Sequence, residues 1–394
     1  MANDPINLSF DNLEVAFASK TNAQLRKTYW LFAAMNNTGL MNFGTSAMQT
    51  ALNWRLPING LVKATIFEQF CGGEDINECQ KTVDELGKFN IGTILDYSVE
   101  GEKSEAGFDA TMREIMATID KAATSKHIPF SVFKVTGVGN FDLLAKVQEA
   151  KNMTDADLKA FDRVRNRVQT ICAYAAKHKV RIFIDAEESW IQQPIDQLAD
   201  EMMAEFNREE AIVYNTYQFY RWATLPTLQQ AVFEAKSKGY QVGAKLVRGA
   251  YMEKERARAA ANKYADPIQP NKKASDEDYD KGVLFCLENL DTVAFCAGTH
   301  NENSSLQLAA EMKKRGIAPN NPRVFFAQLL GMSDNISYNL AKAGYNVAKY
   351  VPYGPVAAVM PYLMRRAQEN TSIAGQSSRE FSLITRERER RKIQ

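Results

Sequence analysis

The stretch VRIFIDAEES, residues 180–189, joins an apolar run to three acidic side chains that follow it almost immediately. Val180 to Ile184 has the length and composition of one buried strand, and the carboxylates come where that strand would end. Seven other short apolar runs occur between residues 92 and 350, separated by longer amphipathic stretches. This alternation is typical of repeated strand–helix units that build a parallel sheet.

Eight such units favour a closed barrel over an open doubly wound sheet, and no GxGxxG motif supports the open sheet. We therefore expect an α/β fold, a TIM-like (βα)8 barrel over residues 91–394. Residues 1–90 are expected to form an N-terminal helical arm, because Met, Leu and Ala residues recur at helical spacing between Leu25 and Leu86. The predicted strands are Gly92–Tyr97, Phe130–Val135, Val180–Ile184, Ala211–Thr216, Val242–Val247, Thr292–Ala297, Arg323–Ala327 and Tyr345–Tyr350.

Composition excludes several classes of protein. The 394 residues are 45% hydrophobic and 24% charged with a net charge of +1, as in ordinary globular proteins, and no basic stripe predicts a nucleic-acid partner. Five scattered cysteines without a CxxC pair argue against a disulfide framework and a zinc site, and favour a reducing compartment. No signal or transit peptide and no membrane-spanning apolar run is evident, so the expected location is cytoplasmic, with at most peripheral contact with a membrane.

Polar side chains gather at the predicted C-terminal ends of the strands, where barrel enzymes carry their active sites. Lys134 interrupts an apolar run and therefore needs a partner, for which Asp185 on the next strand is the candidate. Glu187 and Glu188 could simply begin the following helix. In KLVRGAY, residues 245–251, the glycine would let a phosphorylated or flavin-like ligand approach the main chain, or would only serve a strand–helix turn.

The segment YLMRRAQE, residues 362–369, places Tyr362, Arg365, Arg366 and Glu369 on one face of a helix. Two neighbouring guanidinium groups beside an aromatic ring suit the carboxylate of an amino acid. The alternative is a surface helix in which an arginine and the glutamate form an ordinary ion pair.

A divalent metal site is the competing interpretation of the carboxylates. Only three histidines are present, and His127 and His178 precede predicted strands, at the end of the barrel opposite the expected site. His300 follows the sixth strand and could contact a ligand or satisfy a local hydrogen bond. One histidine makes a poor metal centre, so no metal is expected.

Six motifs follow one another along the chain: IDAE (184–187), KLVRGAY (245–251), GTHN (298–301), QLLGM (328–332), KYVPYGP (349–355) and YLMRRAQEN (362–370). In this order they resemble those of the proline dehydrogenase family, most closely its monofunctional, eukaryotic-type branch, and the resemblance spreads over about residues 92–372. It implies a distorted barrel that binds FAD and oxidises L-proline to Δ1-pyrroline-5-carboxylate by hydride transfer from proline C5 to FAD N5, the first step of proline catabolism. The implied partners are a membrane quinone as electron acceptor, reached by transient membrane-surface contact, and a separate pyrroline-5-carboxylate dehydrogenase.

The resemblance also implies residue roles. Arg365 and Arg366 would hold the proline carboxylate with Lys134 beside them, and Asp185 would orient this group. Glu100 resembles the family's gating acid, which pairs with the first arginine when substrate is absent. The residues implied to wall the proline ring are Tyr350, Tyr362, Tyr251 and Leu246. The residues implied to contact FAD are Gln218, Lys245, Val247, Arg248, Gly249, Ala250, His300, Asn301 and Glu369.

Two rival functions from other classes are considered. One is a metal-dependent lyase or hydrolase on the same barrel, and the other is a catalytically silent barrel kept as a binding protein. The intact set of Lys134, Asp185, Tyr350, Arg365 and Arg366 speaks against a silent barrel.

Overall fold

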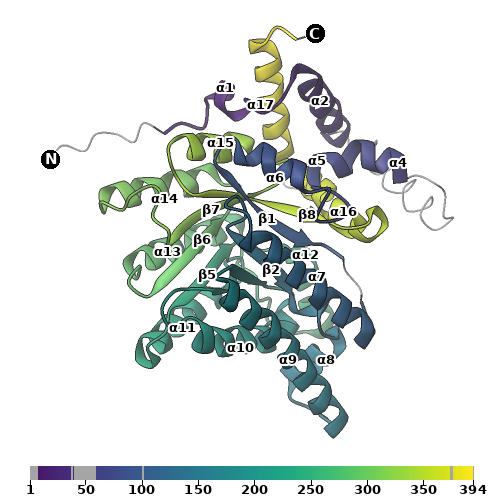
Figure 1. Ribbon diagram of the computed structural model, residues 1–394, viewed down its shortest axis with the longest axis vertical. Helices are drawn as coiled ribbons and strands as arrows, with labels where there is room; N and C mark the ends of the chain where they lie inside the picture. Colours follow the sequence, from purple (N-terminus) through teal and green to yellow (C-terminus); the bar gives the residue numbers. More distant parts are fainter. Residues whose placement is uncertain (1–7, 37–38, 40–58, 100–101, 373–375, 394) are drawn as a thin grey trace.

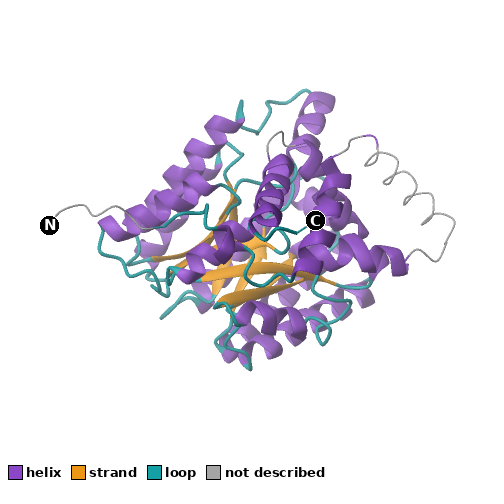
Figure 2. Cartoon of the chain, turned by 90° about the horizontal axis from the view of Figure 1, so that it is seen from above, coloured by secondary structure: helices purple, strands orange, loops and turns teal. Residues whose placement is uncertain are grey.

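The computed structural model describes residues 8–36, 39, 59–99, 102–372 and 376–393. Eight parallel strands close into a barrel in the order β1 to β8, and helices surround it (Figures 1 and 2). The predicted fold class is therefore confirmed. The strands are β1 Ile91–Tyr97, β2 Phe130–Lys134, β3 Arg181–Asp185, β4 Val213–Gln218, β5 Val242–Val247, β6 Val293–Gly298, β7 Val324–Leu329 and β8 Val347–Tyr353.

The helices fall into a group before the first strand and a group that alternates with the strands or follows them (Figure 1). The first group is α1 Leu13–Ala16, α2 Asn22–Asn36, α4 Asn59–Val62, the π-helical turn η1 Lys63–Phe67, α5 Glu68–Phe70 and α6 Gln80–Gly87. The second group is α7 Glu105–Ala123, the 3-10 turn η2 Val135–Gly137, α8 Phe141–Glu149, α9 Asp155–His178, α10 Ser189–Phe206, α11 Thr224–Lys238, α12 Met252–Asn262, α13 Lys272–Glu288, α14 Glu302–Lys314, α15 Asp334–Lys342, α16 Val356–Ser372 and α17 Gln376–Arg390.

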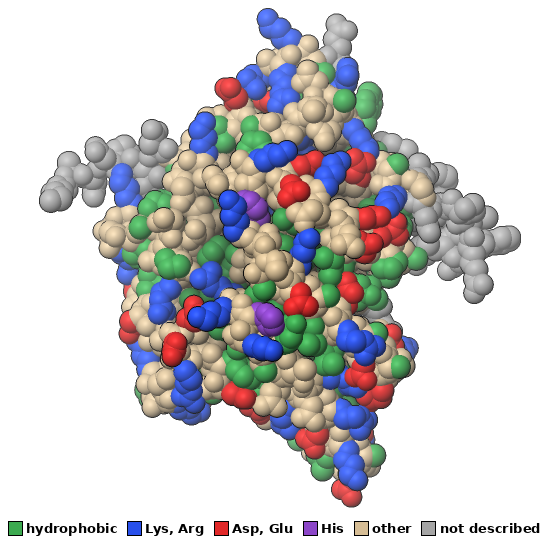
Figure 3. All heavy atoms as spheres, in the orientation of Figure 1, with side chains coloured by type: hydrophobic (Ala, Val, Ile, Leu, Met, Phe, Trp, Pro, Cys, Tyr) green, Lys and Arg blue, Asp and Glu red, His purple; other side chains and the backbone are tan. Residues whose placement is uncertain are grey.

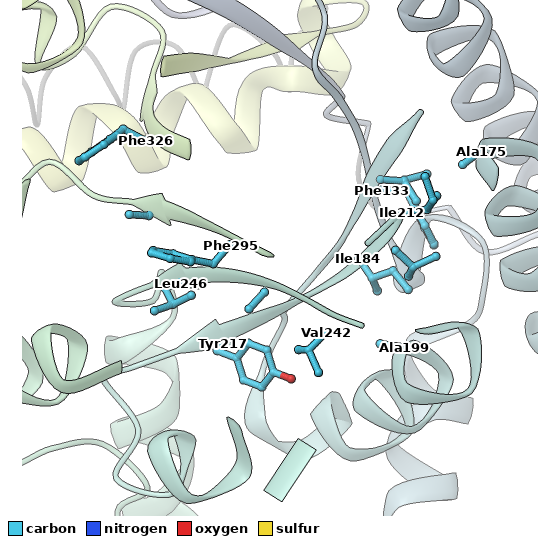
Figure 4. Packing of buried hydrophobic residues seen from close by; sticks show 14 of the residues in the cluster. Phe133, Ala175, Ile184, Ala199, Ile212, Tyr217, Val242, Leu246, Phe295 and Phe326 are labelled. Atoms are coloured by element: carbon cyan, nitrogen blue, oxygen red, sulfur yellow. The ribbon is translucent and has the colours of Figure 1, made fainter. Parts of the chain in front are cut away.

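The core has an inner and an outer layer because successive side chains of a strand point to opposite faces. Inside the barrel, the rings of Phe130 and Phe183 stack with their centroids 4.3 Å apart. The outer layer lies between the strands and the helices and includes Tyr217, Leu246 and Phe295 (Figure 4). The interior of the barrel is thus filled by side chains.

Seven of the eight strands differ from the predicted bounds by one to three residues, and β5 alone agrees. Two of the larger differences have a clear physical reason. β8 continues to Tyr353 and does not stop at Tyr350, because its last residues still pair with β1, Tyr353 opposite Tyr97. β4 begins at Val213, two residues later than expected, because the loop before it bonds to Asn207: its side-chain oxygen accepts from the main-chain nitrogens of Ile212 and Val213. Both differences depend on tertiary partners that a local pattern does not contain.

The N-terminal and C-terminal helices pack against each other, with α2 and α17 side by side (Figure 1). They share an apolar cluster that includes Leu25, Phe32 and Leu383. Arg391, just after α17, donates to the main-chain oxygens of Phe17 and Lys20 at 2.8 and 2.7 Å. The division into an arm over 1–90 and a barrel over 91–394 stays a prediction.

On the face shown in Figure 3, lysine and arginine side chains alternate with aspartate and glutamate, consistent with a net charge of +1. Among the described helices, none has both the length and the apolar character that crossing a bilayer requires.

Candidate active site

Asp185 is the centre of a buried polar cluster at the C-terminal ends of the strands. Its Oδ1 accepts hydrogen bonds from Lys245 Nζ and from the Tyr350 hydroxyl, the latter at 2.9 Å. Lys245 also donates to the Tyr350 oxygen at 2.8 Å. On the other side, Lys134 Nζ lies 3.6 Å from Asp185 Oδ2 and 3.9 Å from Asp96 Oδ1. The expected pairing of Lys134 with Asp185 is therefore present.

The barrel register explains how these side chains meet. Lys134 and Asp185 are direct partners in the β2–β3 pairing, so their side chains leave the sheet at the same level. Lys245 lies on β5, and its side chain crosses the interior over the rings of Phe183 and Tyr350, at 5.1 and 4.6 Å from their centroids. These aromatic faces stabilise an ammonium group that is almost completely buried.

The electrostatics keep Asp185 ionised. Burial alone would raise the pKa of Asp185, but the charges of Lys245 and Lys134, with the hydrogen bonds from Lys245 and Tyr350, together lower it below its usual value. Burial, together with the charges of Asp185 and Asp96, raises the pKa of Tyr350 well above its usual value. The cluster therefore contains an anion, a neutral phenol and two lysines.

The predicted arginine helix is α16, which runs on through Pro361 without ending there. Arg366 is 8% exposed and its guanidinium carbon lies 5.3 Å from the centre of the Tyr362 ring. Burial raises the pKa of Tyr251, and the charges of Lys134 and Arg365 oppose that rise. Because α16 begins directly after the C-terminal end of β8, it carries its arginines to the same end of the barrel as Asp185.

Two predicted site residues are not described in full. Glu100 lies outside the described residues. Glu369 belongs to α16, but its side chain lies outside what the structure describes. Their predicted roles as gating acid and flavin contact stay predictions.

Leu246 is not brought to the cluster. It is fully buried in the outer layer between β5 and the helices, on the face opposite Lys245 (Figure 4). The strand pleat is the physical reason, because adjacent residues 245 and 246 must point to opposite sides of the sheet.

Glu187 and Glu188 do more than begin the next helix. Glu187 is buried and accepts from the main-chain nitrogen of Thr136 at 3.0 Å, and burial raises its pKa to about 7. Glu188 accepts from Lys254 at 2.9 Å. Gln218, at the end of β4, donates to the Glu187 main-chain oxygen at 2.7 Å. These contacts tie the loop after β3 to its neighbours on both sides.

Arg248, directly after β5, is held as a fixed cation. Its guanidinium donates to Asp276, to Thr299 Oγ1 at 2.7 Å and to Ser304 Oγ at 2.9 Å, and it lies 4.3 Å from the centre of the Tyr279 ring. An arginine locked by three hydrogen bonds and a ring keeps its charge in one place.

The residues beside Arg248 leave the main chain accessible. Gly249 has a φ of 136°, which side-chain-bearing residues rarely adopt, and a Cβ there would lie 2.4 Å from the Tyr220 ring. Gly249 and Ala250 are exposed, whereas Val247 is half-buried. A fixed cation next to open main chain suits an anionic ligand, and the phosphates of a flavin nucleotide fit this description.

His300 and Asn301 follow β6 on the same side. Asn301 caps α14 by accepting from the Ser304 main-chain nitrogen at 3.2 Å, and His300 Nδ1 lies 2.9 Å from Ser333 Oγ. Burial and the charges of Lys349, Arg366 and Arg248 lower the pKa of His300 to about 3. His300 is therefore neutral at physiological pH.

Sequence reasoning missed Lys349, which is fully buried on β8. Its ammonium donates to Asp334 at 2.8 Å and to the main-chain oxygen of Met332 at 2.5 Å. The available signal was a lysine inside the apolar run that became β8, one residue before Tyr350. Within the described ranges, no group of three or more histidine, cysteine or carboxylate side chains is placed to hold a metal ion.

The closed barrel and the cluster at its strand ends define a (βα)8-barrel enzyme. The chain belongs to the proline dehydrogenase family of oxidoreductases, because the family model for proline dehydrogenase matches residues 79–379. The resemblance inferred from the motifs is thereby confirmed.

Two curated relatives and one solved structure illustrate the similarity. The chain is 31% identical to "Proline dehydrogenase 1, mitochondrial" of Dictyostelium discoideum, covering 95% of this chain and 74% of the relative. It is 34% identical to "Carbapenem antibiotics biosynthesis protein CarD" of Pectobacterium carotovorum subsp. carotovorum, covering 82% and 84%. A crystal structure of proline utilization A from Bdellovibrio bacteriovorus shares the fold with a TM-score of 0.72 at 18% identity, covering 95% of this chain but 39% of that one.

Proposed function

We propose that this protein is an FAD-dependent dehydrogenase that oxidises L-proline to Δ1-pyrroline-5-carboxylate, the first step of proline catabolism. One observation carries the proposal: the buried cluster of Asp185, Lys245, Tyr350 and Lys134 lies at the barrel end that also receives the arginines of α16. Family membership supplies the reaction class, and the cluster supplies groups that fit a small amino acid.

The substrate carboxylate would be held by Arg365 and Arg366 with Lys134 beside them. Asp185 is already satisfied by Lys245, Tyr350 and Lys134, so it would keep Lys134 in place. Tyr350, Tyr362 and Tyr251 would pack on the apolar ring. Several cations around the site would also lower the pKa of the substrate ammonium group, which makes the free amine easier to reach.

The cofactor would lie on the side of Arg248, Gly249 and His300. Arg248 would meet its negative charge, and the main chain at Gly249 and Ala250 would approach it closely. Gln218, Lys245, Val247 and Asn301 would complete this contact set, with Glu369 of α16. Bound FAD supplies the acceptor for the hydride of proline C5, at its N5. The protein's task is to orient the proline ring so that C5 faces that acceptor.

The electron acceptor and partners belong to the same proposal. Electrons would pass to a quinone during transient contact of this cytoplasmic protein with a membrane surface. A pyrroline-5-carboxylate dehydrogenase would take the product onward.

An absorption spectrum of the purified protein, recorded before and after anaerobic addition of L-proline, tests the proposal. Oxidised-flavin bands that bleach with L-proline are expected. L-Alanine is the control, because it has the carboxylate and amine of proline but no C5. Flavin bands that L-proline leaves unchanged would contradict the substrate, and a colourless protein that does not bind added FAD would favour the metal-enzyme and binding-protein rivals.

A further inference from the structure

Helix α17 contacts the start of α14, just after His300, and also the loop between β7 and α15. Arg379, on its first turns, pairs with Glu302, which lies two residues after His300 at the start of α14. The next residue, Glu380, accepts from the main-chain nitrogen of Ser333 at 2.7 Å, in the loop between β7 and α15. Glu380 follows directly after the residues matched by the family model, so the family assignment gives it no role.

The loop that carries Ser333 is fixed from several directions. Ser333 has a φ of 50°, a left-handed conformation that a residue with a side chain adopts only when its surroundings hold it. Lys349 donates to the Met332 main-chain oxygen, and Gln69 donates to the Gly331 main-chain oxygen at 2.9 Å. Elements far apart in the sequence therefore place the Ser333 hydroxyl next to His300.

The types of donor and acceptor around the Ser333 hydroxyl determine the direction of its hydrogen bonds. Glu380 Oε1 lies 3.4 Å from Ser333 Oγ. Because the same oxygen already accepts from the Ser333 main-chain nitrogen, it is an acceptor, and the hydroxyl proton of Ser333 is directed to it. Ser333 Oγ is then available to accept from His300 Nδ1 at 2.9 Å. A neutral imidazole with its proton on Nδ1 has a lone pair on Nε2.

We propose that Glu380 of α17 is a positioning residue that acts through Ser333 to fix the tautomer of His300, with the proton on Nδ1 and with Nε2 as an acceptor for the cofactor. The part of this inference that concerns the cofactor rests on the proposed function. Glu380 itself is buried and faced by Ser333, Asp334 and Lys349, and burial raises its pKa to about 7. α17 thereby becomes part of the cofactor site.

Nitrogen-15 NMR of histidine-labelled protein tests the inference directly, because the chain has only three histidines. The His300 signals are assigned by their loss in His300→Gln. Ser333→Gly removes the hydroxyl while suiting a positive φ, so the loop conformation is retained. Glu380→Ala removes the acceptor, and Glu380→Gln restores an acceptor oxygen. Glu389→Ala, at an exposed position of the same helix, is the matched control.

We expect the Nδ1-protonated form in the unmodified protein, in Glu380→Gln and in Glu389→Ala. Ser333→Gly and Glu380→Ala should shift His300 toward the other tautomer and weaken FAD retention by about tenfold, the effect of one lost hydrogen bond. An unchanged His300 tautomer in both variants would overturn the inference, even if their melting temperatures fall. A tautomer that follows the variants in a protein whose flavin does not respond to L-proline would uphold the positioning role and contradict the proposed substrate.

Discussion

Lys245 and Asp185 form an ion pair across the inside of the barrel, although β4 lies between their strands. Their side chains are 6% and 11% exposed, so both charges depend on partners inside the cluster for their stabilisation. Lys245, inferred from the family resemblance to lie near the flavin, is therefore also part of the cluster that surrounds Asp185.

Lys245→Met should destabilise the protein, because among the described residues it leaves Lys134 as the one cation paired with the buried carboxylate of Asp185. Urea denaturation at pH 7 should show a loss of about 3 kcal/mol in unfolding free energy. This loss should shrink as the pH falls below about 4. The pKa of Asp185 is lower in the folded protein than in the unfolded chain, so the ion pair stabilises the fold only where the unfolded carboxyl is ionised. Lys238→Met, which removes an exposed ion pair with Glu234, is the control. Equal losses of unfolding free energy in the two variants would contradict the role of Lys245 as the buried partner of Asp185.

Arg366→Met should weaken proline binding far more than FAD retention, because the guanidinium is assigned to the substrate carboxylate. Proline titrations of flavin bleaching and FAD titrations of the apoprotein measure the two separately. A loss on the order of a hundredfold in proline affinity is expected for one charged hydrogen-bond partner. Arg386→Met, at a half-exposed arginine of α17, should change neither. Equal losses of proline and FAD binding in Arg366→Met would contradict the role.

Tyr350→Ser should narrow the preference for L-proline over hydroxyproline, because the phenol ring would crowd a 4-hydroxyl group. The ratio of the two kcat/KM values should shift by on the order of tenfold. Tyr350→Phe separates the steric effect of the ring from the effect of the hydroxyl, because it loses the hydrogen bond to Asp185 but keeps the ring. The steric explanation fails if the ratio is the same in Tyr350→Ser as in the unmodified enzyme.

The unfolding free energy of Glu187→Gln, relative to that of the unmodified protein, should increase as the pH rises. The folded-state pKa of Glu187 is about 7, above its ordinary value of 4.5, so the folded protein binds the extra proton between these values. The unfolding free energy of the unmodified protein therefore falls through this window, by at most about 3 kcal/mol. Urea denaturation at pH 5 and at pH 7.5 measures the unfolding free energy of both proteins. If the variant and the unmodified protein differ by the same amount at the two pH values, the prediction is wrong.

The sequence predicted the features that depend on local pattern. β5 has the predicted bounds, because an apolar β-branched run and a glycine-containing turn identify it without help from the rest of the chain. Lys134 and Asp185 were paired correctly, because both end neighbouring strands and a buried lysine requires a nearby anion.

The contacts that were missed join residues with no regular spacing. Lys245 reaches Asp185 past an intervening strand, and Glu380 reaches Ser333 from a helix 47 residues further along the chain. No periodicity encodes such pairs. Leu246 shows the complementary problem, because a motif names a residue while the pleat of the strand decides which way its side chain points.

The loop around Ser333 has a consequence for how the protein is made. It is tied by Gln69, which emerges early during synthesis, and by Glu380, which emerges hundreds of residues later. A nascent chain on the ribosome can close most of the barrel before α17 exists, but it cannot hold this loop in its final shape. The capacity to bind a ligand beside His300 should therefore arise only once α17 has been synthesised, after the barrel itself has formed.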